Sequence, residues 1–368
     1  MHAERLDRVR AVMGTQGVDV LLLSVGPDLP WLTGYEAMPL ERLTMLVVPR
    51  DGEVTLVVPR LEAPRVQERP EVFAIRPFGE ATDPIRLVAE LAGAARTVAV
   101  GDRTWARFVL DLQGALPGAS WHKASAVTGP LRAVKDAAEI VALRRAAEAA
   151  DRVAAQLQGG EIALVGRSEA DVSADIGRRL VAEGHQRVNF AIVASGPNAA
   201  SPHHDADHRA IRSGEVVLCD FGGTMAADGG AGYCSDITRC VSIGDPPNEV
   251  AEAYAVLREA QAAAVQAAVV GTACEDVDAA ARQIIDAAGY GERFFHRTGH
   301  GIGVEEHEDP YVVAGNATPL VPGHAFSVEP GIYTADRWGL RLEDIVVAAA
   351  DGPDALNQAD HALVVVDA

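Results

Sequence analysis

The first third of the chain alternates between strand-like and helical hydrophobic patterns. Residues 18–24 form an unbroken apolar run, which is typical of a strand buried on both faces. Two similar runs flank the turn sequence RDGE and predict a β-hairpin. Alternation of this kind predicts an α/β domain over residues 1–128. Its expected elements are helices at 6–17 and 107–116, strands at 18–24, 42–49, 54–59 and 97–102, and a loop at 24–35.

A second pattern begins after residues 117–130, whose glycines and prolines predict a connection between two domains. Two helices followed by antiparallel strands occur in this order twice in the remaining chain. This repetition predicts an internal structural duplication within a domain of residues 129–368. The expected helices are 135–157, one that opens at Ser168, 248–270 and 275–288, and the expected strands are 188–195, 215–223, 233–244, 324–330 and 339–348.

Acidic residues interrupt several of these apolar strand patterns. Asp220 follows VVLC, Asp236 lies in SDITR, Glu329 follows AFSV, and Glu343 lies in LRLED. A buried carboxylate without a partner is unfavourable by several kcal/mol, so each must be paired, protonated or bound to a cation. Asp344 fits the simpler alternative of a structural ion pair with an arginine.

The segment HRTGHGIGVEEHEDP, residues 296–310, adds histidines to this set of acids. A phosphate-binding loop would need a helix after the glycines, and VEEHEDPY reaches a proline without forming one. Gly299 and Gly301 flank His300 and argue against a helical zinc pair. Carboxylates with one imidazole suit Mn²⁺, Co²⁺ or Zn²⁺, and their summed charge suits two bridged ions better than one. A polar surface turn is the alternative.

Composition narrows the class of protein further. A net charge of −20 disfavours nucleic acid as a partner, because phosphate contacts need clustered Lys and Arg. The N-terminal segment is charged and amphipathic, unlike a signal peptide, and no apolar run has the length of a membrane span. The 4 cysteines include no CxxC pair, which predicts small buried thiols in a reduced, cytoplasmic protein with no membrane partner.

The motifs resemble those of the pita-bread metallopeptidases, the group that contains methionine aminopeptidase, aminopeptidase P and prolidase. DFGG…GYCSDITR is similar to the hairpin that carries two aspartate ligands, and the histidine-glycine segment to the one that carries the histidine ligand. SVEPGIY and GLRLED are similar to the two glutamate segments. The resemblance implies an α+β catalytic domain with two divalent ions, Mn²⁺ or alternatively Co²⁺ or Zn²⁺. The implied ligands are Asp220, Asp236, His300, Glu329 and Glu343.

The resemblance also assigns residues around the metals. ASGPNAASPHH contains His203, which is similar to the upstream active-site histidine of the family, whereas His204 and His208 are interpreted as loop residues. Glu329 is implied as the proton shuttle, and His203 and His307 as catalytic residues that stabilise the oxyanion or serve the leaving nitrogen. His296 and Arg341 are implied as substrate-binding residues. The glycines are expected to bring the backbone close to the metals, and Glu305, Glu306, Glu308 and Asp309 to be solvated or structural.

The activity implied is hydrolysis of the Xaa-Pro bond in dipeptides or short peptides by a metal-activated hydroxide, in a homodimer. The N-terminal domain favours this branch, because methionine aminopeptidase usually lacks one. Aminopeptidase P, which acts on longer Xaa-Pro-Yaa peptides, is the alternative, and a non-hydrolytic creatinase-like relative is another. One departure is the Asp220–Asp236 spacing, which is longer than the family pattern at residues 225–232, where extra loop length is cheap.

Overall fold

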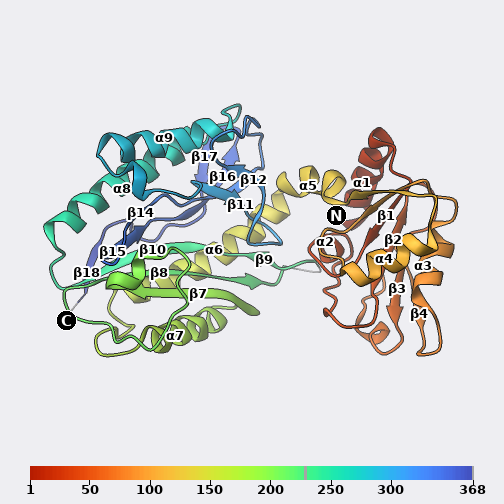
Figure 1. The fold of residues 1–368 in the computed structure, drawn as a ribbon, viewed down its shortest axis with the longest axis horizontal. Coiled ribbons are helices and arrows are strands. Elements are labelled where there is room, and N and C mark those ends of the chain that lie inside the picture. Colours follow the sequence, from red (N-terminus) through yellow and green to blue (C-terminus); the bar gives the residue numbers. More distant parts are fainter. Residues whose placement is uncertain (228–229, 367–368) are drawn as a thin grey trace. The chain divides into compact units, whose positions relative to one another are not determined.

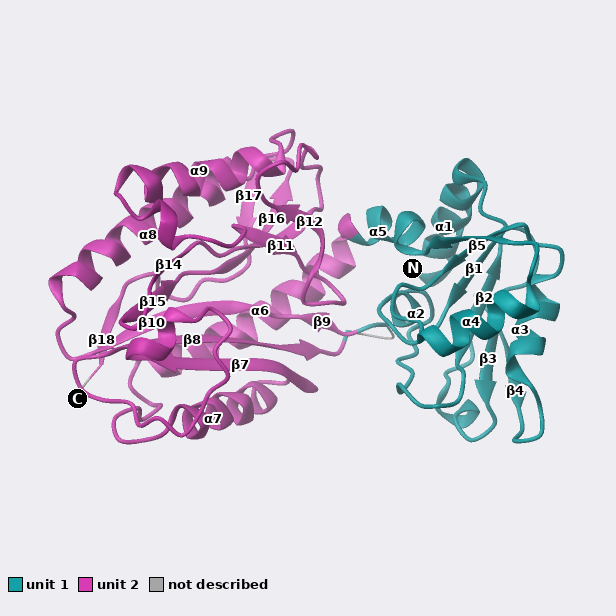
Figure 2. Cartoon of the chain, in the orientation of Figure 1, with its two compact units in different colours: residues 1–132, 227–231 teal, residues 133–226, 232–368 magenta. Residues whose placement is uncertain are grey.

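The computed structural model describes residues 1–227 and 230–366, which form two compact units (Figures 1 and 2). The first consists of Met1–Arg132 together with Ala227–Ala231, and the second of Ala133–Ala226 together with Gly232–Ala368, in each case as far as the residues are described. Asp228 and Gly229, in the long loop between Asp220 and Asp236, lie outside the described residues.

A mixed six-stranded sheet forms the centre of the first unit, in the order β4-β3-β2-β1-β5-β6. The antiparallel pairing of β2 with β3 confirms the predicted hairpin, and β5 lies parallel to β1. Apolar strand residues such as Leu22 and Val98 pack against Phe108 and Leu112 of the helical layer. The elements are α1 (His2–Gln16), β1 (Val20–Leu23), α2 (Asp28–Thr33), β2 (Met45–Pro49), β3 (Thr55–Pro59), η1 (Ala63–Arg65), β4 (Ala74–Phe78), α3 (Pro84–Ala92), β5 (Thr97–Val100), α4 (Ala106–Ala115), β6 (Ser120–Lys123) and α5 (Ser125–Ala133).

Two segments of this unit differ from the sequence prediction. The loop predicted at 24–35 contains the buried helix α2, in which Pro30 lies in the first turn, where a proline is tolerated. Asp28 of this helix forms an ion pair with Arg132, 3.1 Å away. The connection predicted at 117–130 contains β6, which pairs with β5, and most of α5, so the predicted boundary after residue 128 falls inside a helix. In both places tertiary contacts override the local signal of glycine and proline.

The second unit contains two five-stranded sheets, each preceded by a pair of helices, as the repeated pattern predicts. One sheet has the order β18-β10-β8-β7, with β9 paired to β8, and the other β12-β11-β13-β16-β17. Apolar residues of α6 and α7 pack against the first sheet, and those of α8 and α9 pack on residues from both sheets (Figure 1). The helices and the strands of the first half are α6 (Ala137–Gln158), α7 (Glu169–Ala182), β7 (Arg187–Ser195), η2 (Gly196–Ala200), β8 (Val216–Met225), β9 (Tyr233–Cys234), β10 (Ile237–Ile243), α8 (Asn248–Ala267), α9 (Cys274–Ala287) and η3 (Gly291–Arg293).

The strands of the second half are short and frequently interrupted. They are β11 (Gly299–Gly301), β12 (Glu308–Val312), β13 (Ala325–Val328), β14 (Gly331–Thr334), β15 (Trp338–Arg341), β16 (Asp344–Ala349), β17 (Gly352–Ala355) and β18 (Val364–Val366). The sequence predicts one strand over 339–348, but the structure divides it into β15 and β16 with Leu342 and Glu343 between them. The predicted arm 233–244 is likewise divided, with Ser235 and Asp236 between β9 and β10. Both interruptions occur at acidic residues, Asp236 and Glu343, whose side chains line a cavity.

The four cysteines, Cys219, Cys234, Cys240 and Cys274, are free and buried, which confirms the prediction of small buried thiols. Among the helices of the described ranges 1–227 and 230–366, none is long and apolar enough to cross a membrane.

The glycines beside His300 are required by strand packing, and their expected closeness to metal ions stays a prediction. A Cβ atom on Gly299 would lie 1.8 Å from the carbonyl oxygen of Ser327, and one on Gly301 would lie 2.1 Å from that of Asp309. These contacts are with the backbones on either side of β11, which pairs with both β12 and β13. The glycines therefore allow β11 to fit between its two neighbours.

Replacing Gly299 by alanine should destabilise the second unit, because neither backbone can move away without breaking strand hydrogen bonds. We expect a loss of roughly 1–3 kcal/mol or more in the free energy of unfolding, measured as a lower urea midpoint. Gly177→Ala is the matched control, since a Cβ atom there would meet Val188 at an ordinary 3.6 Å inside helix α7. That variant should gain roughly 0.5–1 kcal/mol. Equal midpoints for the two variants would contradict the packing argument.

Candidate metal centre

One cavity of about 860 Å³ in the second unit brings together the residues that the sequence predicts for the site. Its walls are otherwise partly apolar, with Phe190 and Ile192 on β7 and Phe295 just before His296. The predicted site residues that line it are Asp220, Asp236, His300, Glu329, Glu343, His203, His296, His307 and Arg341.

Strand register explains how the acids converge. Asp220 on β8 lies opposite Thr238 on β10, so Asp236, two residues earlier, is its diagonal neighbour across the hairpin. Gly222 makes this possible, because a Cβ atom there would lie 2.1 Å from the carbonyl oxygen of Ser235. Thr238 also forms a β-bridge with Glu343, which joins the two sheets at the cavity. The backbone therefore fixes three of the four carboxylates before any side-chain contact is considered.

His300 presents one ring nitrogen to the acids. Its Nε2 atom lies 3.1 Å from Glu329 Oε1 and 3.8 Å from Asp236 Oδ2. Its Nδ1 atom lies 3.2 Å from the carbonyl oxygen of Gly301, which accepts a hydrogen bond only if Nδ1 carries the proton. With its proton on Nδ1, the ring presents Nε2 to the acids, where a protonated ring donates to Glu329 and a neutral ring offers a lone pair to a metal ion.

The burial of the acids strongly affects their protonation. Burial raises the pKa of Asp236 well above its usual value, and the nearby carboxylates of Glu343 and Asp220 raise it further. Burial, with the charge of Glu329, likewise raises the pKa of Glu343 well above the usual value. The pKa of Asp220 is also raised by burial, although the Arg341 guanidinium opposes the effect. These carboxylates therefore lack enough positive charge from the protein to be ionised together.

Glu329 differs from the other acids. Burial opposes its ionisation, but the hydrogen bond and charge of His300, with the charges of His296 and Arg341, lower its pKa to about 2. Ser327 donates a further hydrogen bond to its Oε1 atom at 3.1 Å. Glu329 is therefore ionised at neutral pH on the cavity wall.

Two carboxylate oxygens are buried without a partner. Among the described residues, no hydrogen-bond donor reaches Asp220 Oδ1 or Glu343 Oε1. Their companion oxygens are satisfied, since Arg341 donates to Asp220 Oδ2 at 2.5 Å and Thr238 donates to Glu343 Oε2 at 2.6 Å. A buried acceptor is rarely left unpaired, so these atoms indicate where a cation fits. Oxygen-rich ligands with one imidazole are the donor set that divalent ions such as Mn²⁺ accept.

Two of the acids and His300 lie close enough together to hold a metal ion. Ligand atoms of Asp236, His300 and Glu343 lie within 4.8 Å of one another, and all three residues are buried. Asp220 and Glu329 line the same cavity, and Glu329 contacts His300, but neither belongs to this subset.

Arg341 is more constrained than a free substrate-binding arginine would be. It is 2% exposed, and its guanidinium donates to Asp220, Thr238, Tyr333 and the carbonyl oxygen of Pro202. Its nitrogens thus already have protein partners. The sequence pattern does not reveal this, because the partners come from four separate segments.

Several residues at the site carry no distinct sequence signal. Tyr333 links the two predicted substrate-binding residues, since its hydroxyl lies 3.0 Å from His296 Nε2 and accepts from Arg341 at 2.8 Å. Arg297 also lines the cavity, and its only described side-chain contact is with the ring of Tyr311, 4.6 Å from the ring centroid. The position of Thr238 beside the acids could be inferred from SDITR, because Thr238 follows Asp236 by two residues and alternate residues of a strand share a face.

The remaining predicted histidines, His307 and His203, also line the cavity. The His307 ring lies 4.0 Å from that of His300, and burial, reinforced by the charges of His300 and Arg297, lowers its pKa to about 4. His203 is exposed and reaches the cavity from the loop after η2. Of the acids in the histidine-glycine segment, Glu306 lines the cavity, whereas Glu308 is buried and pairs with Lys135 at 2.5 Å.

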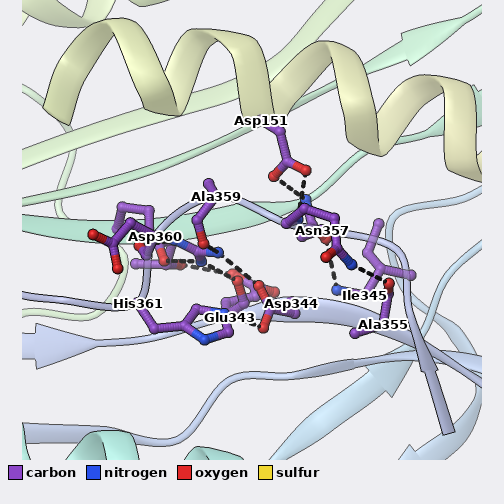
Figure 3. A network of polar contacts seen from close by, with 12 residues as sticks. Asp151, Glu343, Asp344, Ile345, Ala355, Asn357, Ala359, Asp360 and His361 are labelled. Carbon is purple, nitrogen blue, oxygen red and sulfur yellow. Dashed lines mark hydrogen bonds and ion pairs between the residues drawn. The ribbon is translucent and has the colours of Figure 1, made fainter. Parts of the chain in front are cut away.

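A polar network whose members do not line the cavity contacts the backbone of Glu343 (Figure 3). Arg239 pairs with Asp344 at 2.8 Å, and both are buried, which confirms the ion pair that the sequence suggests for Asp344. Arg239 also donates to the backbone oxygens of Thr238 and Glu343. Asp151 accepts from Asn357 at 3.2 Å, and Asn357 in turn accepts from the backbone of Ile345. Polar contacts outside the cavity thereby hold both residues of the bridge between the two sheets, Thr238 and Glu343.

The chain is similar to known peptidases along its whole length. It is 45% identical over 370 residues to the probable dipeptidase PepE of Mycobacterium tuberculosis, covering 100% of this chain and 97% of that protein. It is 34% identical to the Xaa-Pro dipeptidase of Lactobacillus helveticus, covering 98% of each chain. The structure of a prolidase from Thermococcus sibiricus superposes with a TM-score of 0.93 at 36% identity, covering 100% of this chain and 99% of that one.

Both units match family models. The creatinase/prolidase N-terminal domain matches residues 5–134, and metallopeptidase family M24 matches residues 141–350, which include the acids and histidines of the cavity. Because the second match spans more than half of the chain, the chain belongs to metallopeptidase family M24.

Proposed function

We propose that this metallopeptidase hydrolyses Xaa-Pro dipeptides with two divalent cations, of which Mn²⁺ is the proposed metal and Co²⁺ or Zn²⁺ the alternatives. The observation that carries the proposal is the pair of buried, unpartnered oxygens on Asp220 and Glu343, within a cluster of acids around His300. Similarity to proteins named dipeptidase and Xaa-Pro dipeptidase supports the substrate class. The proposed ligands are Asp220, Asp236, His300, Glu329 and Glu343.

When bound, such cations lower the pKa of a water molecule and polarise the scissile carbonyl. Glu329 lines the cavity and would accept the proton of the attacking water and later deliver it. His203 and His307 would donate hydrogen bonds to the developing oxyanion or to the leaving nitrogen. With its pKa near 4, His307 is neutral at pH 7 and donates from one nitrogen only.

The lining of the cavity suits a proline-containing substrate. An Xaa-Pro bond has no N–H group, so recognition must rely on packing and on polar groups elsewhere in the peptide. Phe190, Ile192 and Phe295 supply apolar surface, and His296 is held by Tyr333 at the cavity wall.

Arg297 is the stronger candidate for the free carboxylate of a dipeptide. Both Arg341 and Arg297 line the cavity, but Arg341 already donates to Asp220 and other protein acceptors. Arg297 has no hydrogen bond or ion pair from its side chain among the described residues. A guanidinium in this position can bind a carboxylate through two parallel hydrogen bonds. Arg341 then acts mainly by orienting Asp220 and Tyr333.

Two alternatives predict different behaviour. An aminopeptidase P would prefer a tripeptide, in which the proline carboxylate is part of a peptide bond. A non-hydrolytic relative would neither contain metal nor cleave Xaa-Pro peptides when Mn²⁺, Co²⁺ or Zn²⁺ is added. The homodimer and the cytoplasmic location stand as parts of the proposal, and the four buried free thiols are compatible with a reducing compartment.

Removing the imidazole should release metal without unfolding the chain. We expect His300→Ala to lose nearly all Ala-Pro hydrolysis and to retain less Mn²⁺ after dialysis than the unmodified protein, measured by elemental analysis. Its circular dichroism spectrum should be unchanged. His208→Ala is the control, because His208 is an exposed residue of the loop that contains His203. Normal metal content and activity in His300→Ala would refute the ligand assignment.

The substrate class can be tested with a peptide series under added Mn²⁺. We expect Ala-Pro to be cleaved at least 10-fold faster, in kcat/KM, than Ala-Pro-Ala or Ala-Pro-amide, since charge-assisted hydrogen bonds are each worth about 1.5–3 kcal/mol. Arg297→Ala should raise KM for Ala-Pro and remove most of this preference. Arg293→Ala is the matched control, as Arg293 is exposed and does not line the cavity. Faster cleavage of the tripeptide by the unmodified protein would favour the aminopeptidase P alternative.

A further inference from the structure

Glu169 is a buried carboxylate outside the cavity, with four hydrogen-bond donors around it. It is the first residue of helix α7 and is fully buried. Its Oε1 atom accepts from the backbone N–H and the hydroxyl of Ser195, each at 2.7 Å. Its Oε2 atom accepts from Asn198 Nδ2 at 2.9 Å and contacts His204 Nε2 at 2.8 Å. All of these partners lie in one segment that begins at the end of β7.

The same segment delivers His203 to the cavity. After the turn η2, Ser201, Pro202 and His203 line the cavity wall. The residue before His203 is fixed by Arg341, which donates to the carbonyl oxygen of Pro202 at 3.2 Å. The residue after it, His204, is fixed by Glu169. The side chain of His203 is exposed and has no hydrogen bond or ion pair with the residues that the structure describes, so its position depends on these two anchors.

His204 therefore has more than the loop role that the sequence suggests. Glu169, His204 and Asp207 also place possible ligand atoms within 4.8 Å of one another, which raises the alternative of a second metal site. The hydrogen bonds argue against it. Both oxygens of Glu169 already have two donors each, and His204 Nε2 faces Glu169 and Asn198. The cluster is complete without a cation.

We propose that Glu169 and His204 form a positioning pair that holds His203 at the reacting carbonyl. The proposal rests on the role of His203 in the proposed function. Neither Glu169 nor His204 lines the cavity, so neither is a catalytic residue. Their effect reaches the reaction through the backbone of residues 202–204. Misplacing a catalytic group by about 1 Å can lower a rate roughly 100-fold, so loss of the pair should be readily measured.

A double-mutant cycle tests whether Glu169 acts through His203. Glu169→Gln replaces one acceptor oxygen by an NH₂ group, which donates only and so can accept from neither Asn198 nor His204. We expect it to lower kcat for Ala-Pro about 10- to 100-fold in the unmodified protein, with little change in KM. In the His203→Ala background the same substitution should lower kcat less than about 2-fold. Equal losses in both backgrounds would overturn the proposal, because Glu169 would then act on the scaffold in general.

A conservative variant separates positioning from general stability. His204→Gln keeps a side-chain N–H that can reach Glu169, whereas His204→Leu removes it. We expect near-normal kcat for His204→Gln and a loss similar to that of Glu169→Gln for His204→Leu, with metal content unchanged. His208→Leu, in the same loop, is the control. If His204→Gln and His204→Leu lose the same activity, the hydrogen bond to Glu169 is not the cause.

A spectroscopic measurement of His203 tests the positioning role even if Ala-Pro is not a substrate. Protein labelled with ¹⁵N-histidine and loaded with Zn²⁺ should show a His203 resonance, identified by its loss in His203→Ala. We expect this resonance to shift or broaden in His204→Leu and to be unchanged in His204→Gln and His208→Leu. An unchanged signal in His204→Leu would overturn the positioning role. Absence of Xaa-Pro hydrolysis together with the expected shift would overturn only the proposed function.

Discussion

The central constraint on this protein is the burial of four carboxylates around one imidazole and one guanidinium. In a site shielded from water, like charges at short range cannot all be ionised without compensation. The acids differ accordingly. His300 and Arg341 lower the pKa of Glu329, whereas burial and neighbouring carboxylates raise the pKa of Asp236 and of Glu343. Burying these acids without enough positive charge lowers the stability of the folded chain, and cations bound in the cavity would supply the missing charge.

The rest of the second unit serves to keep this arrangement in place. The two sheets meet at the bridge between Thr238 and Glu343, and Arg239 with Asp344 fixes that bridge from the side away from the cavity. Gly222 and Gly299 allow backbones to approach where any side chain would separate them. The acids of the cavity are thus held by strand geometry and by polar groups that do not line the cavity, which is how outer-shell residues orient the ligands of metal sites in general.

Most of the fold and the set of residues around the cavity could be predicted from the sequence. Long periodic segments such as 135–157 and the apolar runs 18–24 and 188–195 carry strong local signals, and the acids stand out because they interrupt such runs. The helix α2 and the pairing of β6 could not be predicted, because each depends on contacts with distant residues, such as Arg132 with Asp28. The same is true of the site. Its members are visible in the motifs, but the engagement of Arg341 and the link between Glu169 and His204 join segments far apart in sequence.

The unpartnered oxygens of Asp220 and Glu343 also connect activity to the lifetime of the folded protein. A cation that binds only the native state stabilises it by an amount that rises with the logarithm of the free cation concentration, because the unfolded chain has no preformed site for the cation. The metal supply of the cell would therefore set how often this chain opens, and with it how readily other proteases degrade it. Scarcity of the cation would then lower the amount of folded enzyme as well as the fraction of it that holds metal.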